Sequence, residues 1–288
     1  MRVSLAVHLV RLHIIAIAAL AALTFGWTFD GRRDWLVPLL VACDWFFVNL
    51  LNRVVDVAED VKNGVPGADV AGRRARAIAV LCWSVLAAAT ALQLWLAPEL
   101  TWLRVAFHAI GFAYNYKLIP LGARHARLKE LYFWKNFSSG VLFVISVLLM
   151  PLARSHAAVP WPRVAVLAAF FLPLELTYEI IYDLRDVAGD RAEGIRTFPV
   201  VHGARASRWI VAALLTASGA ALAAGWAFGA VRLREGVKLA AVAQQALAMA
   251  TFLSGDVSDR AALGVTWLGA AQLASYNAWV ALGLPLGK

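Results

Sequence analysis

The chain has 288 residues, of which 61% are apolar and 16% charged, whereas soluble globular proteins average about 45–50% apolar and about 25% charged residues. With a mean hydropathy of +0.69, this composition excludes a disordered chain and a water-soluble fold, because so much apolar surface needs a bilayer as its solvent. The net charge of +9 does not indicate nucleic-acid binding, since Lys and Arg stand in short segments between apolar runs. The sequence therefore predicts an integral membrane protein without a nucleic-acid partner.

Successive apolar runs fill the chain, each about as long as the roughly 20-residue helix that crosses a hydrocarbon core. The nine runs cover residues 7–27, 35–55, 77–97, 100–119, 131–152, 162–182, 208–229, 237–254 and 262–283. Lipid offers the backbone no hydrogen-bond partners, so each run is expected to be helical, and the alternation typical of a barrel is not seen. We predict an all-α fold in which residues 1–288 form one domain, an integral membrane bundle of about nine transmembrane helices.

Basic residues are distributed unevenly between the connections. With nine spans, the N-terminus and the connections after the second, fourth, sixth and eighth spans lie on one side, and they carry most of the Lys and Arg. Positive charge is retained on the cytoplasmic side of membranes. We therefore expect a multi-pass protein, in the inner membrane of a cell, whose N-terminus is cytoplasmic.

Acidic side chains, joined in one case by an asparagine, form two stripes at the ends of two spans. The first stripe, at the end of the second span, consists of Asn52, Asp56 and Asp60. The second stripe, at the end of the sixth span, consists of Glu179, Asp183, Asp186 and Asp190. Residues three or four apart share one face of a helix, and the topology places both stripes on the cytoplasmic side.

Carboxylates along one helix face repel one another, so a compensating cation is expected. Mg²⁺ prefers oxygen ligands and is commonly completed by the phosphates of a substrate. Two facing stripes could hold such ions and, through them, a diphosphate. The alternative is that the stripes are solvated helix ends, which explains less well why two of them share one side with Asn52 in register.

Four sequence elements resemble the UbiA superfamily of intramembrane prenyltransferases. Asn52-x3-Asp56-x3-Asp60 and Asp183-x2-Asp186-x3-Asp190 are similar to its two aspartate-rich motifs. The run from Gly194 to Gly203 resembles the Gly-x-Lys/Arg-Thr-x-Pro-Val-x-x-Gly segment that follows the second motif, and Tyr114-Asn115-Tyr116-Lys117 resembles the Tyr-to-Lys element after the fourth helix. Because the number of spans and the placement of the motifs also agree, the resemblance covers essentially the whole chain.

The resemblance implies Mg²⁺-dependent transfer of a prenyl group from an allylic prenyl diphosphate to an aromatic or other lipophilic acceptor inside the membrane. The metal ligands that it implies are Asn52, Asp56, Asp60, Glu179, Asp183, Asp186 and Asp190. Asp56 and Asp183 would be catalytic, because the metal that they hold would neutralise the leaving diphosphate.

Basic and aromatic residues complete the expected donor site. Lys117 would contact phosphate oxygens as a catalytic cation, with Arg124, Arg127 or Lys135 as helpers. Tyr114, from the same element as Lys117, is also expected at this site.

The allylic cation needs an electron-rich wall. Trp45 precedes Asn52 by seven residues, which places it within about 20° of the same helix face. We expect Trp45 to be part of the wall, although packing between helices or against lipid is at least as well supported for it.

Two further acids lie deeper in apolar runs, where an ionisable side chain is costly and usually faces a cavity. Asp44 lies in the second span, and Glu175 in the sixth, one turn before Glu179. Glu175 could orient an acceptor or take the proton released on alkylation, or it could be a neutral, hydrogen-bonded core acid. Near the start of the first span, Arg11 and His13 are expected to lie at the interface.

Two other functions use the same residues. A terpene cyclase on this scaffold needs the same metal and diphosphate site but no acceptor, so cyclic products from the donor alone would indicate it. A divalent-cation transporter is a more remote alternative, because the acids cluster at one face of the membrane and Lys117 would repel a passing cation.

Overall fold

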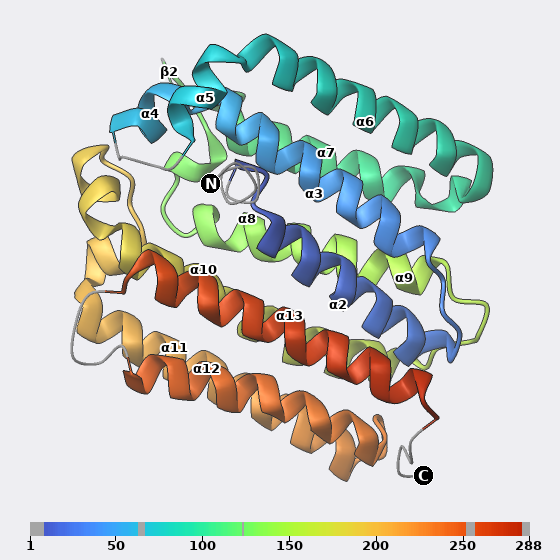
Figure 1. Cartoon of the computed structure of the whole chain (residues 1–288). Helices are drawn as coiled ribbons and strands as arrows, with labels where there is room; N and C mark the ends of the chain where they lie inside the picture. The colour runs from blue at the N-terminus through green and yellow to red at the C-terminus, as the bar shows by residue number, and fades with distance from the viewer. Residues whose placement is uncertain (1–8, 63–66, 123, 252–256, 284–288) are drawn as a thin grey trace.

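Long helices carry most of the chain, and consecutive long helices run in opposite directions (Figure 1). The computed structural model describes residues 9–62, 67–122, 124–251 and 257–283. Six described helical segments are long and apolar enough to cross a membrane. They are α2 (Leu12–Asp30), α3 (Leu36–Val55), α6 (Ala75–Leu96), the continuous run of α8 (Trp134–Phe143), η3 (Val144–Leu149) and α9 (Met150–Ala153), α10 (Trp161–Ala192) and α11 (Phe198–Ala227).

Helices also form in the other three predicted spans. These are α7 (Thr101–Asn115), α12 (Leu239–Thr251) and α13 (Asp259–Ala281). The first two are short, with 15 and 13 residues, and α13 contains Gln272 and Asn277, which lower its hydropathy. The all-α fold is thus confirmed, whereas length and composition support six of the nine predicted spans. Residues 7, 8 and 252–254 of the predicted runs lie outside the described residues.

Short elements gather at one end of the bundle, where α3, α7 and α10 end and α8 and α11 begin (Figure 1). They are α4 (Val57–Lys62), α5 (Ala68–Arg73), the antiparallel strands β1 (Ile119–Leu121) and β2 (Arg124–Ala126), and η2 (Leu128–Glu130). The hairpin was not expected: the predicted fourth span ran to residue 119, but the backbone turns extended at Tyr116 (φ −115°, ψ 151°). At the opposite end lie η1 (Pro98–Leu100) and η4 (Leu233–Lys238).

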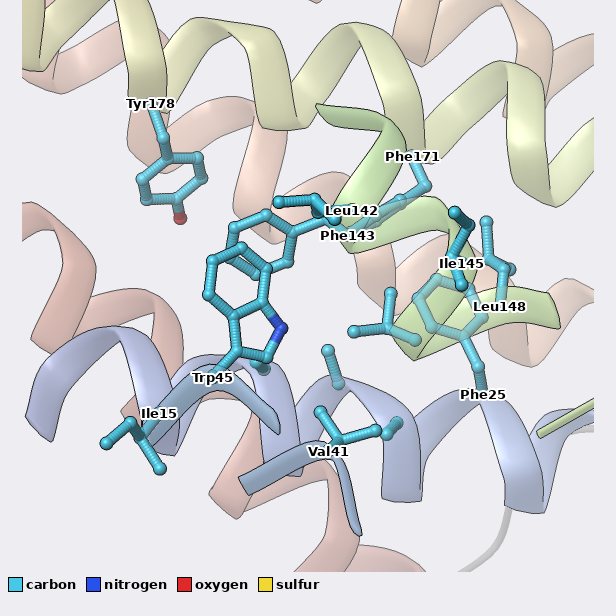
Figure 2. Close-up of a cluster of buried hydrophobic side chains, with 14 of the residues drawn as sticks. Ile15, Phe25, Val41, Trp45, Leu142, Phe143, Ile145, Leu148, Phe171 and Tyr178 are labelled. Atoms are coloured by element: carbon cyan, nitrogen blue, oxygen red, sulfur yellow. The ribbon is translucent and has the colours of Figure 1, made fainter. Parts of the chain in front are cut away.

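Helix α2 lies between α3 and α13 and also packs against η3 and α9 (Figure 1). The interior beside it is filled by aromatic and aliphatic side chains, including Trp45, Phe143, Phe25 and Phe171 (Figure 2). Because apolar side chains fill this interior, the polar ends of α3 and α10 are the part of the bundle where charged ligands can bind.

A buried ion pair ties α3 to α7 within the bundle. Asp44, which is fully buried, accepts hydrogen bonds from Arg104 Nη2 at 2.6 Å and Nε at 3.0 Å. The ring of His108 lies 3.0 Å from the same carboxylate. The expectation that Asp44 faces a cavity was therefore wrong: α7 supplies the cation that allows it to be buried.

We expect Arg104→Leu to reduce the free energy of unfolding by about 3–5 kcal/mol, because it leaves the Asp44 carboxylate buried without its strongest partner. The double variant Asp44→Leu/Arg104→Leu should lose less, since neither charge remains. Denaturant unfolding in detergent measures both. A single variant no less stable than the double variant would contradict the role assigned to the pair.

Candidate functional site

The first stripe lies where α3 passes into α4. Asn52 is in the last turn of α3, Asp56 caps that helix, and Asp60 belongs to α4. The helical hydrogen bonds continue across the junction, from Asp56 N–H to Asn52 O at 2.9 Å and from Asp60 N–H to Asp56 O at 2.8 Å. The three residues therefore keep the common face that their spacing predicts, and all three are buried.

Basic and amide side chains surround the carboxylates of this stripe. Lys129 Nζ donates to Asp56 at 2.6 Å, and Arg127 Nη1 donates to its other oxygen at 2.9 Å. Asp60 accepts a hydrogen bond from Arg53 Nη1 at 2.7 Å. These cations offset the cost of burying two carboxylates side by side.

The second stripe, on α10, is organised by the beginning of α8. Lys135 Nζ lies 3.0 Å from Asp183 and 2.9 Å from Asp190, so one ammonium joins two buried carboxylates. Asn136 Nδ2 donates to Asp183 at 2.7 Å. Helix α8 begins directly after Phe133, whose φ of 70° is unusual for a residue with a side chain. This turn brings Lys135 and Asn136 to α10.

Two other members of the stripe have partners of their own. Glu179 accepts a hydrogen bond from Ser139 Oγ of α8 at 2.7 Å. Asp186 is more exposed and pairs with its neighbour Arg185 at 2.6 Å. The four acids are regularly spaced in the sequence, but they do not share one partner: Asp183 and Asp190 bind Lys135, whereas Asp186 binds Arg185.

The two stripes border one region of the molecule. Arg11, at the start of α2, lies close enough to interact electrostatically with Asp60 of the first stripe and Glu179 of the second. Tyr114, at the end of α7, interacts in the same way with Lys135 and Arg11. Arg11 and Tyr114 therefore lie near the ends of both helices.

Lys117 and Arg124, which the sequence places in the donor site, are exposed on the segment after α7 and on the hairpin. Lys117 lies within electrostatic reach of Glu130, which Arg127 Nε binds at 2.7 Å. Burial alone would raise the pKa of Glu130, but the hydrogen bond and charge of Arg127 outweigh it and hold that pKa below its usual range. The described contacts do not bring Lys117 or Arg124 against the stripes, and their contact with phosphate stays a prediction.

Several residues that contact the stripes were not assigned to the site from the sequence, and three of them show why. Lys129 reaches Asp56, Asn136 reaches Asp183, and Asn115 Oδ1 accepts a hydrogen bond from Asn52 Nδ2 at 2.9 Å. Asn115 and Asn136 could have been recognised in the sequence, because each is a polar residue near one end of an apolar run and next to a residue already selected. No sequence pattern marks Lys129, since its position depends on the hairpin that precedes it.

The deeper predicted residues lie inside the bundle. Trp45 is buried rather than facing lipid, and its Nε1 donates to Ser146 Oγ at 3.1 Å. Its ring centroid is 4.3 Å from that of Phe143 and 5.5 Å from that of Phe107. Glu175 is 6% exposed and has no hydrogen bond or ion pair with a residue that the structure describes.

The oxygen atoms present are suitable for Mg²⁺, although the described residues include no three acidic, His or Cys side chains grouped around one point. Mg²⁺ is usually bound by one or two carboxylates together with phosphate oxygens and water. The pair Asp183 and Asp190, which shares one cation in Lys135 Nζ, matches that pattern. The residues therefore fit a metal that is completed by a phosphate ligand.

Comparison with known proteins gives consistent results. A family model described as the UbiA prenyltransferase family matches residues 12–262. A digeranylgeranylglyceryl phosphate synthase of Natronomonas pharaonis is 28% identical over 163 residues, which are 56% of this chain and 52% of that protein. The match thus spans about half the length of this curated relative.

Solved structures share the fold. A UbiA homologue from Archaeoglobus fulgidus bound to GPP and Mg²⁺ superposes with a TM-score of 0.73 at 16% identity, covering 95% of this chain and 98% of that one. An apo UbiA homologue from Aeropyrum pernix K1 superposes with a TM-score of 0.63 at 17% identity, covering 93% and 98%. At these identities the likeness establishes the fold alone.

We expect Lys135→Met to lower the free energy of unfolding by about 3 kcal/mol or more, because two buried carboxylates lose their shared cation. Mg²⁺ should restore more stability to this variant than to the wild type, since a metal ion can replace the ammonium. Thermal unfolding in detergent with and without Mg²⁺ measures both effects. Lys117→Met, which removes an exposed lysine, serves as the control, and an equal loss in both variants would contradict the assignment.

Proposed function

Because the chain belongs to the UbiA prenyltransferase family, we propose that this multi-pass membrane protein transfers the prenyl group of an allylic prenyl diphosphate to a lipophilic acceptor, with Mg²⁺ as its cofactor. One observation carries the proposal: the buried carboxylates of the two stripes, Asp56, Asp60, Asp183 and Asp190, are paired with cations at one end of an apolar bundle. Carboxylates suit the metal, cations suit the phosphate oxygens, and the apolar interior suits the hydrocarbon chain.

The neighbouring structures support the donor class. Structures of the Archaeoglobus fulgidus homologue are described as bound to GPP and Mg²⁺, to DMAPP and Mg²⁺, and to Cd²⁺. A prenyl diphosphate and a divalent metal are therefore bound by a protein with the same fold.

In the proposed site, both stripes hold the metal. The ligands would come from Asn52, Asp56, Asp60, Glu179, Asp183, Asp186 and Asp190. Bound Mg²⁺ would neutralise the charge that develops on the leaving diphosphate. Lys129, Arg127 and Lys135 already lie against these carboxylates, so each is placed to exchange a carboxylate for a phosphate oxygen.

The remaining predicted residues fit around this centre. Lys117 and Arg124 would approach the diphosphate from the exposed side of the hairpin, and Tyr114 lies between the stripes. Trp45, held by Ser146 and packed against Phe143, would offer an aromatic face in the interior for the allylic cation. Glu175 lies deeper on α10 than Asp183, where it would orient the acceptor or take the proton released on alkylation.

The acceptor is part of the proposal. The relative from Natronomonas pharaonis is named a digeranylgeranylglyceryl phosphate synthase, so acceptors in this family are not restricted to aromatic compounds. We propose an aromatic or other lipophilic acceptor, with the site and the N-terminus on the cytoplasmic side. The orientation is supported by the basic residues of the hairpin and η2, which lie at the same end of the bundle as the stripes.

We expect Asp56→Asn and Asp183→Asn each to reduce prenyl transfer at least a hundredfold, a loss typical when stabilisation of a developing charge is removed. Release of diphosphate from GPP in the presence of a panel of acceptors, with products identified by mass spectrometry, measures this. Asp69→Asn is the matched control, because Asp69 forms an exposed ion pair with Arg73 on α5. Near-normal turnover in either stripe variant would count against the proposed site.

The donor alone distinguishes transfer from cyclisation. Incubation with geranylgeranyl diphosphate and Mg²⁺, but without acceptor, should give little product if the acceptor supplies the electrons for the new bond. EDTA should stop turnover with acceptor, and Mg²⁺ should restore it. Abundant cyclic hydrocarbons or alcohols from the donor alone would replace the transferase with a terpene cyclase on the same site.

A further inference from the structure

Four polar side chains meet in the apolar interior where α10 packs against α12 and α13. Glu175 and Tyr178 come from α10, and Gln244 and Gln245 come from α12. Gln244 Nε2 donates to Val265 O at 2.9 Å and lies 3.5 Å from the Tyr178 hydroxyl. Gln245 lies beside the same hydroxyl, and Glu175 lies within electrostatic reach of it. We call these four residues the interior polar cluster.

The cluster has more hydrogen-bonding atoms than partners. Gln245 is fully buried, and neither its Nε2 nor its Oε1 makes a hydrogen bond of good geometry with a described residue. Gln244 Oε1 also has no partner in the described part of the chain, and the same holds for the Glu175 carboxyl group. Unsatisfied polar groups are costly in an interior that faces hydrocarbon, typically by about 1–3 kcal/mol each. Their retention points to a ligand that supplies the missing hydrogen bonds.

The neighbouring helix leaves room for this cluster. Gly269 of α13 approaches Tyr178 so closely that a Cβ atom at this position would lie 2.5 Å from the Tyr178 hydroxyl oxygen. Glycine is therefore the residue that allows α13 to pack here without displacing the hydroxyl group. Tyr178 and Trp45 enter the same part of the interior from α10 and α3 (Figure 2).

The position of the cluster relates it to the proposed donor site. Glu175 precedes Asp183 by eight residues on one helix, which places it about 12 Å deeper along the helix axis. A diphosphate held at Asp183 would direct its prenyl carbon atoms toward this depth. A molecule bound at the interior polar cluster would therefore lie beside the donor inside the bundle.

The chemistry of the cluster restricts what it can bind. The charged group that acts on Glu175 is another acid, Glu179, and none of the four residues is basic. A carboxylate or phosphate ligand would be repelled here. The Gln245 amide offers a donor and an acceptor at once, which matches a hydroxyl group because a hydroxyl both donates and accepts.

We infer that the interior polar cluster binds the uncharged hydroxyl group of a lipophilic acceptor, such as a phenol or a long-chain alcohol. This inference rests on the proposed function for the identity of the ligand as an acceptor. Gln245 and Tyr178 are the principal hydrogen-bonding groups. The single proton of the ligand hydroxyl is donated either to Gln245 Oε1 or to the Glu175 carboxyl group.

Binding of 4-nonylphenol and of its methyl ether to the full chain in nanodiscs tests the inference. The wild type should bind the phenol roughly three- to tenfold more tightly than the ether, the usual worth of one uncharged hydrogen bond. In Gln245→Leu the phenol should lose this advantage while the ether binds as before. Each probe partitions into the lipid to the same extent in samples of both proteins, so partitioning does not affect the comparison between the wild type and Gln245→Leu.

Two controls separate recognition from folding. Gln245→Leu should unfold at the same temperature as the wild type or higher, because an apolar side chain of similar size replaces an amide without partners. Gln272→Leu, on α13, removes an exposed amide that donates to Ala240 O at 3.4 Å, and it should bind both probes as the wild type does. Tyr178→Phe is a second test variant and should weaken the phenol selectively.

Equal binding of phenol and ether by the wild type, or unchanged phenol binding by both Gln245→Leu and Tyr178→Phe, would overturn the inference. Mg²⁺-dependent binding of GPP is measured on the same samples. A wild type that discriminates between phenol and ether but binds no GPP would contradict the proposed function and leave the hydroxyl site standing. Binding of GPP without discrimination between phenol and ether would overturn the hydroxyl site and leave the proposed function standing.

Discussion

The pairing of buried carboxylates with cations is the interaction on which the functional end of this protein depends. Asp56 is buried because Lys129 and Arg127 reach it, and Asp183 and Asp190 are buried because Lys135 lies between them. An unpaired charge in such surroundings would be strongly destabilising. The same contacts join α3 to η2 and α10 to α8, so the charges also determine how the helix ends are arranged. A metal and a diphosphate would replace these ion pairs with others of the same kind.

Below the charged end of the bundle most side chains are less polar, apart from the buried pair of Asp44 and Arg104 between α3 and α7. Below the charged stripes lie the aromatic side chains around Trp45, which Ser146 fixes from the π-helical segment η3. Extra turns of this kind occur frequently at functional sites. The interior polar cluster, also inside the bundle, provides amide, hydroxyl and carboxyl groups. A prenyl diphosphate would place its diphosphate at the charged stripes and its hydrocarbon chain among the aromatic side chains, and a hydroxyl-bearing acceptor would bind at the interior polar cluster.

Contacts between residues that are far apart in the sequence could not be predicted. The hydrogen bond between Asn52 and Asn115 joins residues 63 apart, and the ion pair of Lys129 with Asp56 joins residues 73 apart. Neither pair has a local pattern, because the contacts depend on how α7 and the hairpin return to α3. Asp44 was recognised as a costly buried acid, but its partner Arg104 lies 60 residues away. The hairpin was not predicted either, because its first strand begins at the end of an apolar run that was assigned to a helix.

From the order of the amino acids alone it follows that this protein is a membrane-embedded, all-α chain and that its acids form two helical stripes. Both follow from local regularities, namely the length of apolar runs and the helical repeat of 3.6 residues per turn. The three-dimensional packing shows which cation neutralises each acid, that Asp186 pairs with Arg185 and not with Lys135, and that Glu175 lies within electrostatic reach of the Tyr178 hydroxyl. These features depend on contacts between side chains of different helices, and the local sequence of one helix does not specify which residues of another helix pack against it.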